Sequence, residues 1–147
     1  MGFVKSIKTM KKYIGTKVIN AIPMNRQEYN DFRGWELPAD EDGTDEGYLV
    51  EYVDGGKANT PQYAGYVSWS PKAVFERAYQ AADTPLDRMY IEYNELMDKY
   101  NKLVLFLGRK DAIEIAGENQ VALMEVQKIQ MHDYLHTLKE RIDLMKK

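Results

Sequence analysis

Two long amphipathic stretches between residues 84 and 147 constrain the fold of this chain more than any other feature of its sequence. In residues 86–107 apolar side chains recur at steps of three and four, the spacing that places them on one face of an α-helix. The same spacing continues through residues 121–145. The pattern predicts two helices of about six and about seven turns, joined by a short connector that Gly108 and Gly117 delimit.

The start of the first helix has a clear local signal. Thr84 is suited to cap the helix, Pro85 has the φ angle of a first helical residue, and Asp87 places an acid in the first turn. At the other end Gly108 is expected at the C′ position. Residues 111–116 are expected to form one further helical turn before the second long helix.

Two helices of this length leave a wide apolar margin when they pack only on each other, so hairpins from other copies are a natural cover. We therefore expect a homo-oligomer. The alternative is that the N-terminal part of the same chain covers the margin.

The N-terminal part has the β-rich runs and turn signals of a small sheet. Residues 13–22 are rich in β-formers and stop at Pro23, and two further strands are expected at residues 47–53 and 65–69. The acidic, glycine-containing residues 37–47 have the composition of an exposed loop.

Two short helices complete the predicted sheet region. Asn25 and Glu28 have the spacing of a capping box for the first. Ser70 as cap and Pro71 as first helical residue would open the second, over residues 72–80, with Val74, Phe75 and Ala78 facing inward.

The sequence thus predicts an α+β fold: a small N-terminal antiparallel sheet with two short helices, followed by a long helical hairpin that oligomerises. We expect a basic leader over residues 1–11, the sheet region over 12–83 and the hairpin over 84–147.

Composition excludes several classes of protein. A net charge of −3 argues against a general DNA or RNA binder, which needs a basic surface for phosphates. The chain has no cysteine, which excludes disulfides and thiolate metal sites and suits a reducing cytoplasm. It also has no apolar run of about 18 residues, as a membrane span would require.

Catalytic motifs are weakly represented. His132 and His136 have the spacing of a helical zinc pair, but no third ligand is indicated, which favours two exposed helical histidines. The serines lie outside any nucleophile-elbow context, and Ser70 is explained as a cap. The acids of residues 40–46 lack apolar surroundings that would raise a pKa. No catalytic or metal-binding residue is therefore predicted, nor any cofactor.

What remains is a set of groups suited to holding a nucleotide. Arg109 and Lys110 follow the first helix, and Lys139 and Arg141 lie on the second, where their charges could meet phosphates. Phe106 and the tyrosines could stack on a base, and Asn119 and Gln120 could read base edges. Residue type alone is weak evidence, because helical aromatic residues usually belong to a core and charges near helix ends usually face water.

Two parts of the chain resemble known families. Residues 12–17, 23–35, 45–50 and 65–71 resemble an N-terminal sheet region common in phage and prophage proteins. The run QKIQMHDYLHTLKERI at residues 127–142 resembles the helical-hairpin domain shared by the first Thoeris anti-defence family and a small anti-CBASS family. The basic residues 1–9 depart from that pattern.

The resemblance implies a phage sponge in the cytoplasm of the infected bacterium, one that binds nucleotide immune signals without cleaving them. Its ligands would be glycocyclic ADP-ribose or related cyclic ADP-ribose isomers, or cyclic di- or trinucleotides. It further implies a homo-oligomer, a hexamer with pockets between protomers, and no DNA, RNA or membrane partner. The alternatives are a phage assembly protein that only oligomerises, and an enzyme that degrades the messenger with His132 and His136.

The resemblance also implies the hairpin motif positions Met131, Tyr134, Leu138 and Arg141. Within such a pocket we expect Arg109 and Arg141 to hold phosphates, Phe106 to stack on a base and Asn119 to read a base edge. The predicted ligand-binding set is therefore Phe106, Arg109, Asn119, Met131, Tyr134, Leu138 and Arg141.

Overall fold

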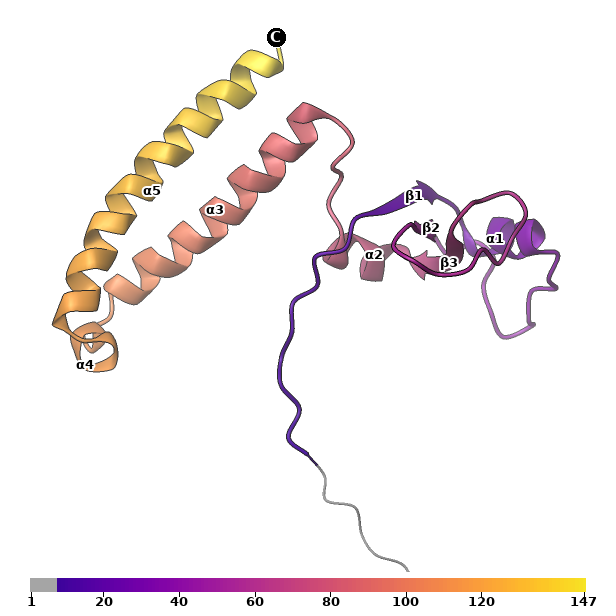
Figure 1. The fold of residues 1–147 in the computed structure, drawn as a ribbon, viewed down its shortest axis with the longest axis horizontal. Helices are drawn as coiled ribbons and strands as arrows, with labels where there is room; N and C mark the ends of the chain where they lie inside the picture. The colour runs from indigo at the N-terminus through magenta and orange to yellow at the C-terminus, as the bar shows by residue number, and fades with distance from the viewer. Residues whose placement is uncertain (1–7) are drawn as a thin grey trace, which may run out of the picture. The chain divides into compact units, whose positions relative to one another are not determined.

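The computed structural model describes residues 8–147 and has two compact units, one ending at Ala78 and the other spanning Tyr79–Lys147 (Figure 1). The first unit contains a small antiparallel sheet and the second contains long helices. The predicted α+β class is confirmed. Residues 1–7 of the expected leader lie outside the described residues.

The sheet has three antiparallel strands in the order β1 (Ile19–Pro23), β2 (Gly47–Tyr52) and β3 (Tyr66–Pro71). Leu49 and Val67 are buried on one of its faces, packed against Tyr29. The β2 and β3 predictions are confirmed to within two residues.

The predicted strand over residues 13–22 is only partly correct, because β1 begins at Ile19. Ile19 pairs with Tyr52, the last residue of β2. The chain preceding Ile19 therefore has no partner strand within the sheet. Residues 8–18 have no regular structure and are exposed.

Helix α1 (Arg26–Arg33) forms where the capping box predicts it. The Asn25 side chain accepts from the Glu28 amide at 2.8 Å, and the Glu28 carboxylate accepts from the Asn25 amide at 3.1 Å. Gly34 ends the helix with φ 73°, a left-handed conformation that favours glycine.

Helix α2 (Lys72–Ala78) begins at the predicted Lys72 and ends two residues before the predicted Gln80, but it follows β3 directly, which corrects the predicted cap. Ser70 and Pro71 are the last residues of the strand and pair with Tyr48 and Gly47, so neither starts a helix. Of the residues predicted to face inward, Val74 and Ala78 are exposed. Phe75 does pack, stacked on Tyr48 with ring centroids 4.0 Å apart.

The second unit is a hairpin of α3 (Pro85–Leu107) and α5 (Glu118–Met145), connected through the short α4 (Ala112–Ala116) (Figure 1). The Thr84 capping box with Asp87 confirms the predicted start of α3. Gly108 follows the last residue of that helix, as predicted, and has φ −76° in the right-handed region, not the left-handed geometry common for a glycine at a helix end.

One face of α5 forms the buried seam of the hairpin, through Met131, Leu135, Leu138 and Ile142. These residues recur at steps of four, three and four, close to the 3.6 residues of one helical turn, which keeps them on one stripe of α5 that faces α3. Leu138 is completely buried, and α3 supplies Met89 with partly buried apolar neighbours. Within residues 8–147 no helix is long and apolar enough to span a membrane.

The seam predicts a large difference between two leucine truncations. Leu138→Ala should lower the free energy of unfolding by about 2–5 kcal/mol, because it leaves a cavity in the seam. Leu105→Ala, on exposed α3 surface, should change it by less than about 0.5 kcal/mol. Urea titrations at one protein concentration measure both, and equal midpoints would contradict the assignment of the seam.

Candidate ligand-binding face of the hairpin

The predicted ligand-binding residues divide between the seam and the surface of the hairpin. Met131 and Leu138 lie in the seam, with 8% and 0% of their surface exposed. A ligand could reach them only if α3 and α5 separated. Their position supports the hairpin, and the remaining predicted residues are accessible or partly accessible.

A second face of α5 carries most of the predicted ligand-binding residues that are accessible. We refer to it as the outer face. It follows steps of three and four through Asn119, Leu123, Val126, Gln130, Tyr134, Thr137, Arg141 and Leu144, all exposed. Leu123 is 65% exposed and Leu144 67%, so this face presents apolar side chains among its polar ones. Leu123 and Val126 are absent from the apolar stripe predicted for this helix, although they recur at the same spacing on this second face.

The length of the outer face separates its polar groups. Asn119 and Arg141 are 22 positions apart, which corresponds to about 33 Å along a helix. That is much longer than one small nucleotide. A single copy of the hairpin therefore cannot bring both residues to one such ligand.

Tyr134 connects the outer face to α3. Its hydroxyl donates to the carboxylate of Glu92. This bond raises the pKa of Tyr134 above its ordinary value, with smaller contributions from desolvation and from the Glu92 charge, while the positive charge of Arg141 acts in the opposite direction. Tyr134 is thus held neutral beside an anion, as a hydrogen-bonding group on an accessible surface.

The contact between Tyr134 and Glu92 also fixes the register of this flank. Because α3 and α5 run antiparallel, each residue forward from Glu92 corresponds to one residue back from Tyr134. Counted in this way, Phe106 lies level with Gln120, at the end of the hairpin where α5 begins. Phe106 is partly buried there. The structure therefore places Phe106 and Asn119 at one end of the hairpin, Tyr134 partway along α5, and Arg141 near the opposite end.

Arg109 lies in the connector, at the same end as Phe106, and is bound to Asp111. Its Nε and Nη2 atoms each lie 2.9 Å from a different oxygen of that carboxylate. The guanidinium lowers the pKa of Asp111, and the carboxylate raises that of Arg109. Both side chains are exposed, so an incoming phosphate would have to displace an acid that already holds the guanidinium by two hydrogen bonds.

The two histidines are exposed helical residues. His132 lies 3.4 Å from the Asp133 carboxylate and His136 lies 3.2 Å from that of Glu140. Over the described part of the chain, no group of three or more histidine, cysteine or acidic side chains is placed to hold a metal ion.

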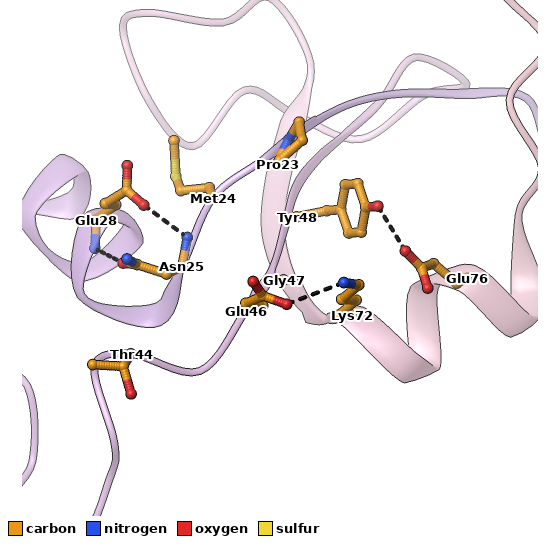
Figure 2. Close-up of a pocket in the computed structure, with 10 residues that line it drawn as sticks. All are labelled: Pro23, Met24, Asn25, Glu28, Thr44, Glu46, Gly47, Tyr48, Lys72 and Glu76. Carbon is orange, nitrogen blue, oxygen red and sulfur yellow. Dashed lines mark hydrogen bonds and ion pairs between the residues drawn. The ribbon is translucent and has the colours of Figure 1, made fainter.

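A cavity of about 470 Å³ lies in the other unit, beside the start of α1 and the start of α2 (Figure 2). Its polar groups already bond one another: Tyr48 donates to Glu76 at 3.0 Å, and Lys72 contacts Glu46 at 3.1 Å. With Glu28, three carboxylates face one lysine. This excess of negative charge disfavours binding of an anionic nucleotide in the cavity. The hairpin is therefore the better candidate for such a site.

The residues of this cavity come from three segments far apart along the chain, so the sequence alone does not predict it. Folding brings these segments together, and no local motif marks them.

Comparison with known proteins singles out the hairpin. Residues 83–144 match the family model Sequestin. The match includes all of α3 and α4 and nearly all of α5, and it leaves the sheet unit outside. Neither a curated protein nor a solved structure matches the chain.

The surroundings of Tyr134 predict a shift in its titration. Glu92→Gln should lower the pKa of Tyr134 toward the ordinary value of about 10, because the negative charge is lost and a neutral amide oxygen is a weaker acceptor than the carboxylate. Tyrosine labelled with ¹³C at Cζ reports this in an NMR pH titration, and Tyr134→Phe assigns the signal. Tyr48, whose pKa Glu76 raises, serves as internal control and should keep its value; an unchanged Tyr134 would refute the contact.

Proposed function

We propose that the hairpin binds and sequesters a small nucleotide signal without turning it over, and that it does so as a homo-oligomer. The observation that carries this proposal is the match of residues 83–144 to Sequestin, a family whose name denotes sequestration. The hairpin also carries the cationic, aromatic and amide groups that suit a nucleotide, while the cavity of the sheet unit is acidic.

Each part of a nucleotide has a suitable partner on the hairpin. Arg109 and Arg141 are arginines, whose planar guanidinium forms paired hydrogen bonds with phosphate oxygens. Phe106 offers a ring on which a base can stack, and the Asn119 amide can both donate to and accept from a base edge. Tyr134 adds a neutral hydroxyl on the outer face.

The separation of these groups is the reason to propose an oligomeric site. Asn119 and Arg141 of one copy are about 33 Å apart, but a second hairpin in antiparallel orientation would bring Arg141 of one copy near Asn119 of the other. The exposed Leu123, Val126 and Leu144 would supply apolar area to such a contact. A hexamer with pockets between protomers, as the resemblance to Thoeris and CBASS sponges implies, is the assembly we propose.

The proposed ligands follow from the same resemblance: glycocyclic ADP-ribose or a related cyclic ADP-ribose isomer, or a cyclic di- or trinucleotide. Binding would take place in the cytoplasm of an infected bacterium and would deprive Thoeris or CBASS effectors of their signal. Because a sponge does not recycle, it must bind tightly, and each tenfold in affinity corresponds to about 1.4 kcal/mol.

One experiment separates sequestration from its alternatives. Purified protein is titrated with glycocyclic ADP-ribose and with a panel of cyclic di- and trinucleotides in a calorimeter, then denatured by heat, and the released ligand is analysed by mass spectrometry. Intact ligand is the expected result. Altered ligand would replace the sponge by a degrading enzyme, and absence of binding to the whole panel would leave a protein that only assembles.

Arg141 gives a residue-level prediction. Arg141→Ala should weaken ligand binding by about 10- to 100-fold, the effect of losing a charge-assisted hydrogen bond, while leaving the oligomer intact. Lys139→Ala is the matched control, because it removes the same charge from the same helix but the ammonium is already bound to Asp143 at 2.9 Å. Calorimetry and light scattering measure both variants; equal affinities for Arg141→Ala and wild type would remove Arg141 from the site.

Asp111 gives a prediction of opposite sign. Asp111→Asn should tighten ligand binding by a few-fold, because Arg109 would no longer have to leave a carboxylate to meet a phosphate. Asp98→Asn is the control: it makes the same charge change on α3 but frees Lys102, to which Asp98 is bound at 2.9 Å. If both variants tighten binding equally, general charge and not Arg109 is responsible.

A further inference from the structure

The segment preceding β1 carries exposed apolar side chains that no part of the described chain covers. Tyr13 is 88% exposed, Ile14 95% and Val18 77%. Single exposed apolar residues are normal on a protein surface, but here they lie close together in a run whose composition is that of a strand. We refer to residues 13–18 as the arm.

The arm continues β1 beyond the sheet. The last residue of the arm precedes Ile19, and Ile19 pairs with the final residue of β2. The arm therefore lies beyond the end of β2, the strand that pairs with β1. At the base of the arm, Lys17 contacts Asp54 at 3.2 Å and lies 5.0 Å from the centre of the Tyr52 ring. These contacts hold the arm next to the end of β2, without a strand beside it.

The two edges of the sheet differ in their protection. At β3, the Asn59 side chain acts as a substitute strand: its amide donates to the Val67 carbonyl and accepts from the Val67 amide, both at 2.8 Å. In the sheet, β1 has β2 as its single neighbour. An edge strand presents a row of backbone donors and acceptors that can pair with another chain.

The direction of these groups follows from the ladder. The Met24 amide donates to the Gly47 carbonyl at 2.9 Å, which continues the β1–β2 pairing by one residue. Because bonding direction alternates along an antiparallel strand, Asn20 and Ile22 face β2, whereas Ile19 and Ala21 direct their backbone groups outward. Outward backbone groups of the arm fall, by the same alternation, at Lys17 and Gly15.

We propose that two copies of this chain join through the arm and β1, paired antiparallel about a twofold axis at Val18, to form one continuous six-stranded sheet. In this register Ile14 of one copy lies opposite Ile22 of the other, Thr16 opposite Asn20, and Val18 opposite Val18. The strand of each copy then extends over residues 13–22, the range that its β-formers indicate.

The register follows from symmetry and side-chain pattern. A twofold axis perpendicular to the sheet keeps each face, so paired residues must belong to the same alternating set. Ile14, Val18 and Ile22 belong to one set. A twofold axis at Val18 pairs Ile14 with Ile22 and Val18 with Val18 across the two strands, and such pairs of β-branched side chains are stabilising. Centres at Lys17 or Ile19 would instead place Ile14 or Val18 opposite Asn20.

The side chains on the other face of the paired strands are also compatible with this register. Gly15, without a side chain, lies opposite Ala21, and Lys17 lies opposite Ile19, so the two Lys17 ammonium groups do not face each other. Lys17 with Ile19 and Gly15 with Ala21 are the pairs that exchange backbone hydrogen bonds. The arm and edge thus provide a complete ladder for a second copy, independent of any ligand on the hairpin.

Disulfide trapping tests the register, because the chain has no cysteine of its own. In Val18→Cys the new side chains of two copies should lie opposite each other at a non-hydrogen-bonded pair, with Cβ atoms about 4.5–5.5 Å apart, within reach of a disulfide. Mild oxidation should therefore convert most of this variant into a covalent dimer on a non-reducing gel, and far-UV circular dichroism should match the wild type.

Matched variants identify the register. Thr16→Cys alone and Asn20→Cys alone should remain mostly monomeric on the gel, because position 16 of one copy lies opposite position 20 of the other and only one of the two is then a cysteine. A chain that carries both substitutions should cross-link. Lys57→Cys, on an exposed loop, measures random collision. Val18→Cys cross-linking no faster than Lys57→Cys would overturn the proposal, as would Thr16→Cys cross-linking as well as Val18→Cys. Since no nucleotide is present, failure here leaves the sequestration test unaffected.

Discussion

Burial of one α5 stripe against α3 is the interaction on which the hairpin depends. Leu138 and Ile142 have almost no exposed surface, and Met89 closes the seam from the other helix. A single neighbouring helix covers one stripe of α5, which leaves the exposed outer face without a partner within the hairpin. The apolar Leu123 and Leu144 on the outer face are therefore available for association, because the seam is already complete without them.

Local signals in the sequence were enough to predict helices α1 and α3 and strands β2 and β3, whereas the extent of β1 and the start of α2 depend on non-local pairing. The capping boxes at Asn25 and Thr84 involve neighbours three residues on, and both α1 and α3 start where those boxes predict. The extent of β1 depends on where β2 ends, and the role of Ser70 depends on its pairing with Tyr48. Such partners lie far along the chain, so the strand start and the α2 cap were misjudged.

The same limit applies to the candidate site. Residue type and spacing identified cationic and aromatic groups, but a periodic pattern does not say which of two faces is turned inward. Met131 and Leu138 accordingly lie in the seam, while Tyr134 lies on the outer face and is bound to Glu92. That contact, between residues on different helices, also had no local signature.

The two surfaces proposed for self-association differ in chemistry, and this difference bears on the kind of assembly they could build. A twofold contact alone ends at a dimer, because each copy uses its one edge, and a closed assembly of six by dihedral symmetry needs a second, different interface. The edge offers backbone hydrogen bonds along β1, whereas the outer face offers leucines and separated polar groups such as Asn119 and Arg141. If ligand contacts join two copies across the outer face, then binding and assembly there stabilise each other, whereas the edge contact forms with or without ligand. A chain organised in this way could exist as preformed dimers through the sheet and complete its pockets only where hairpins meet.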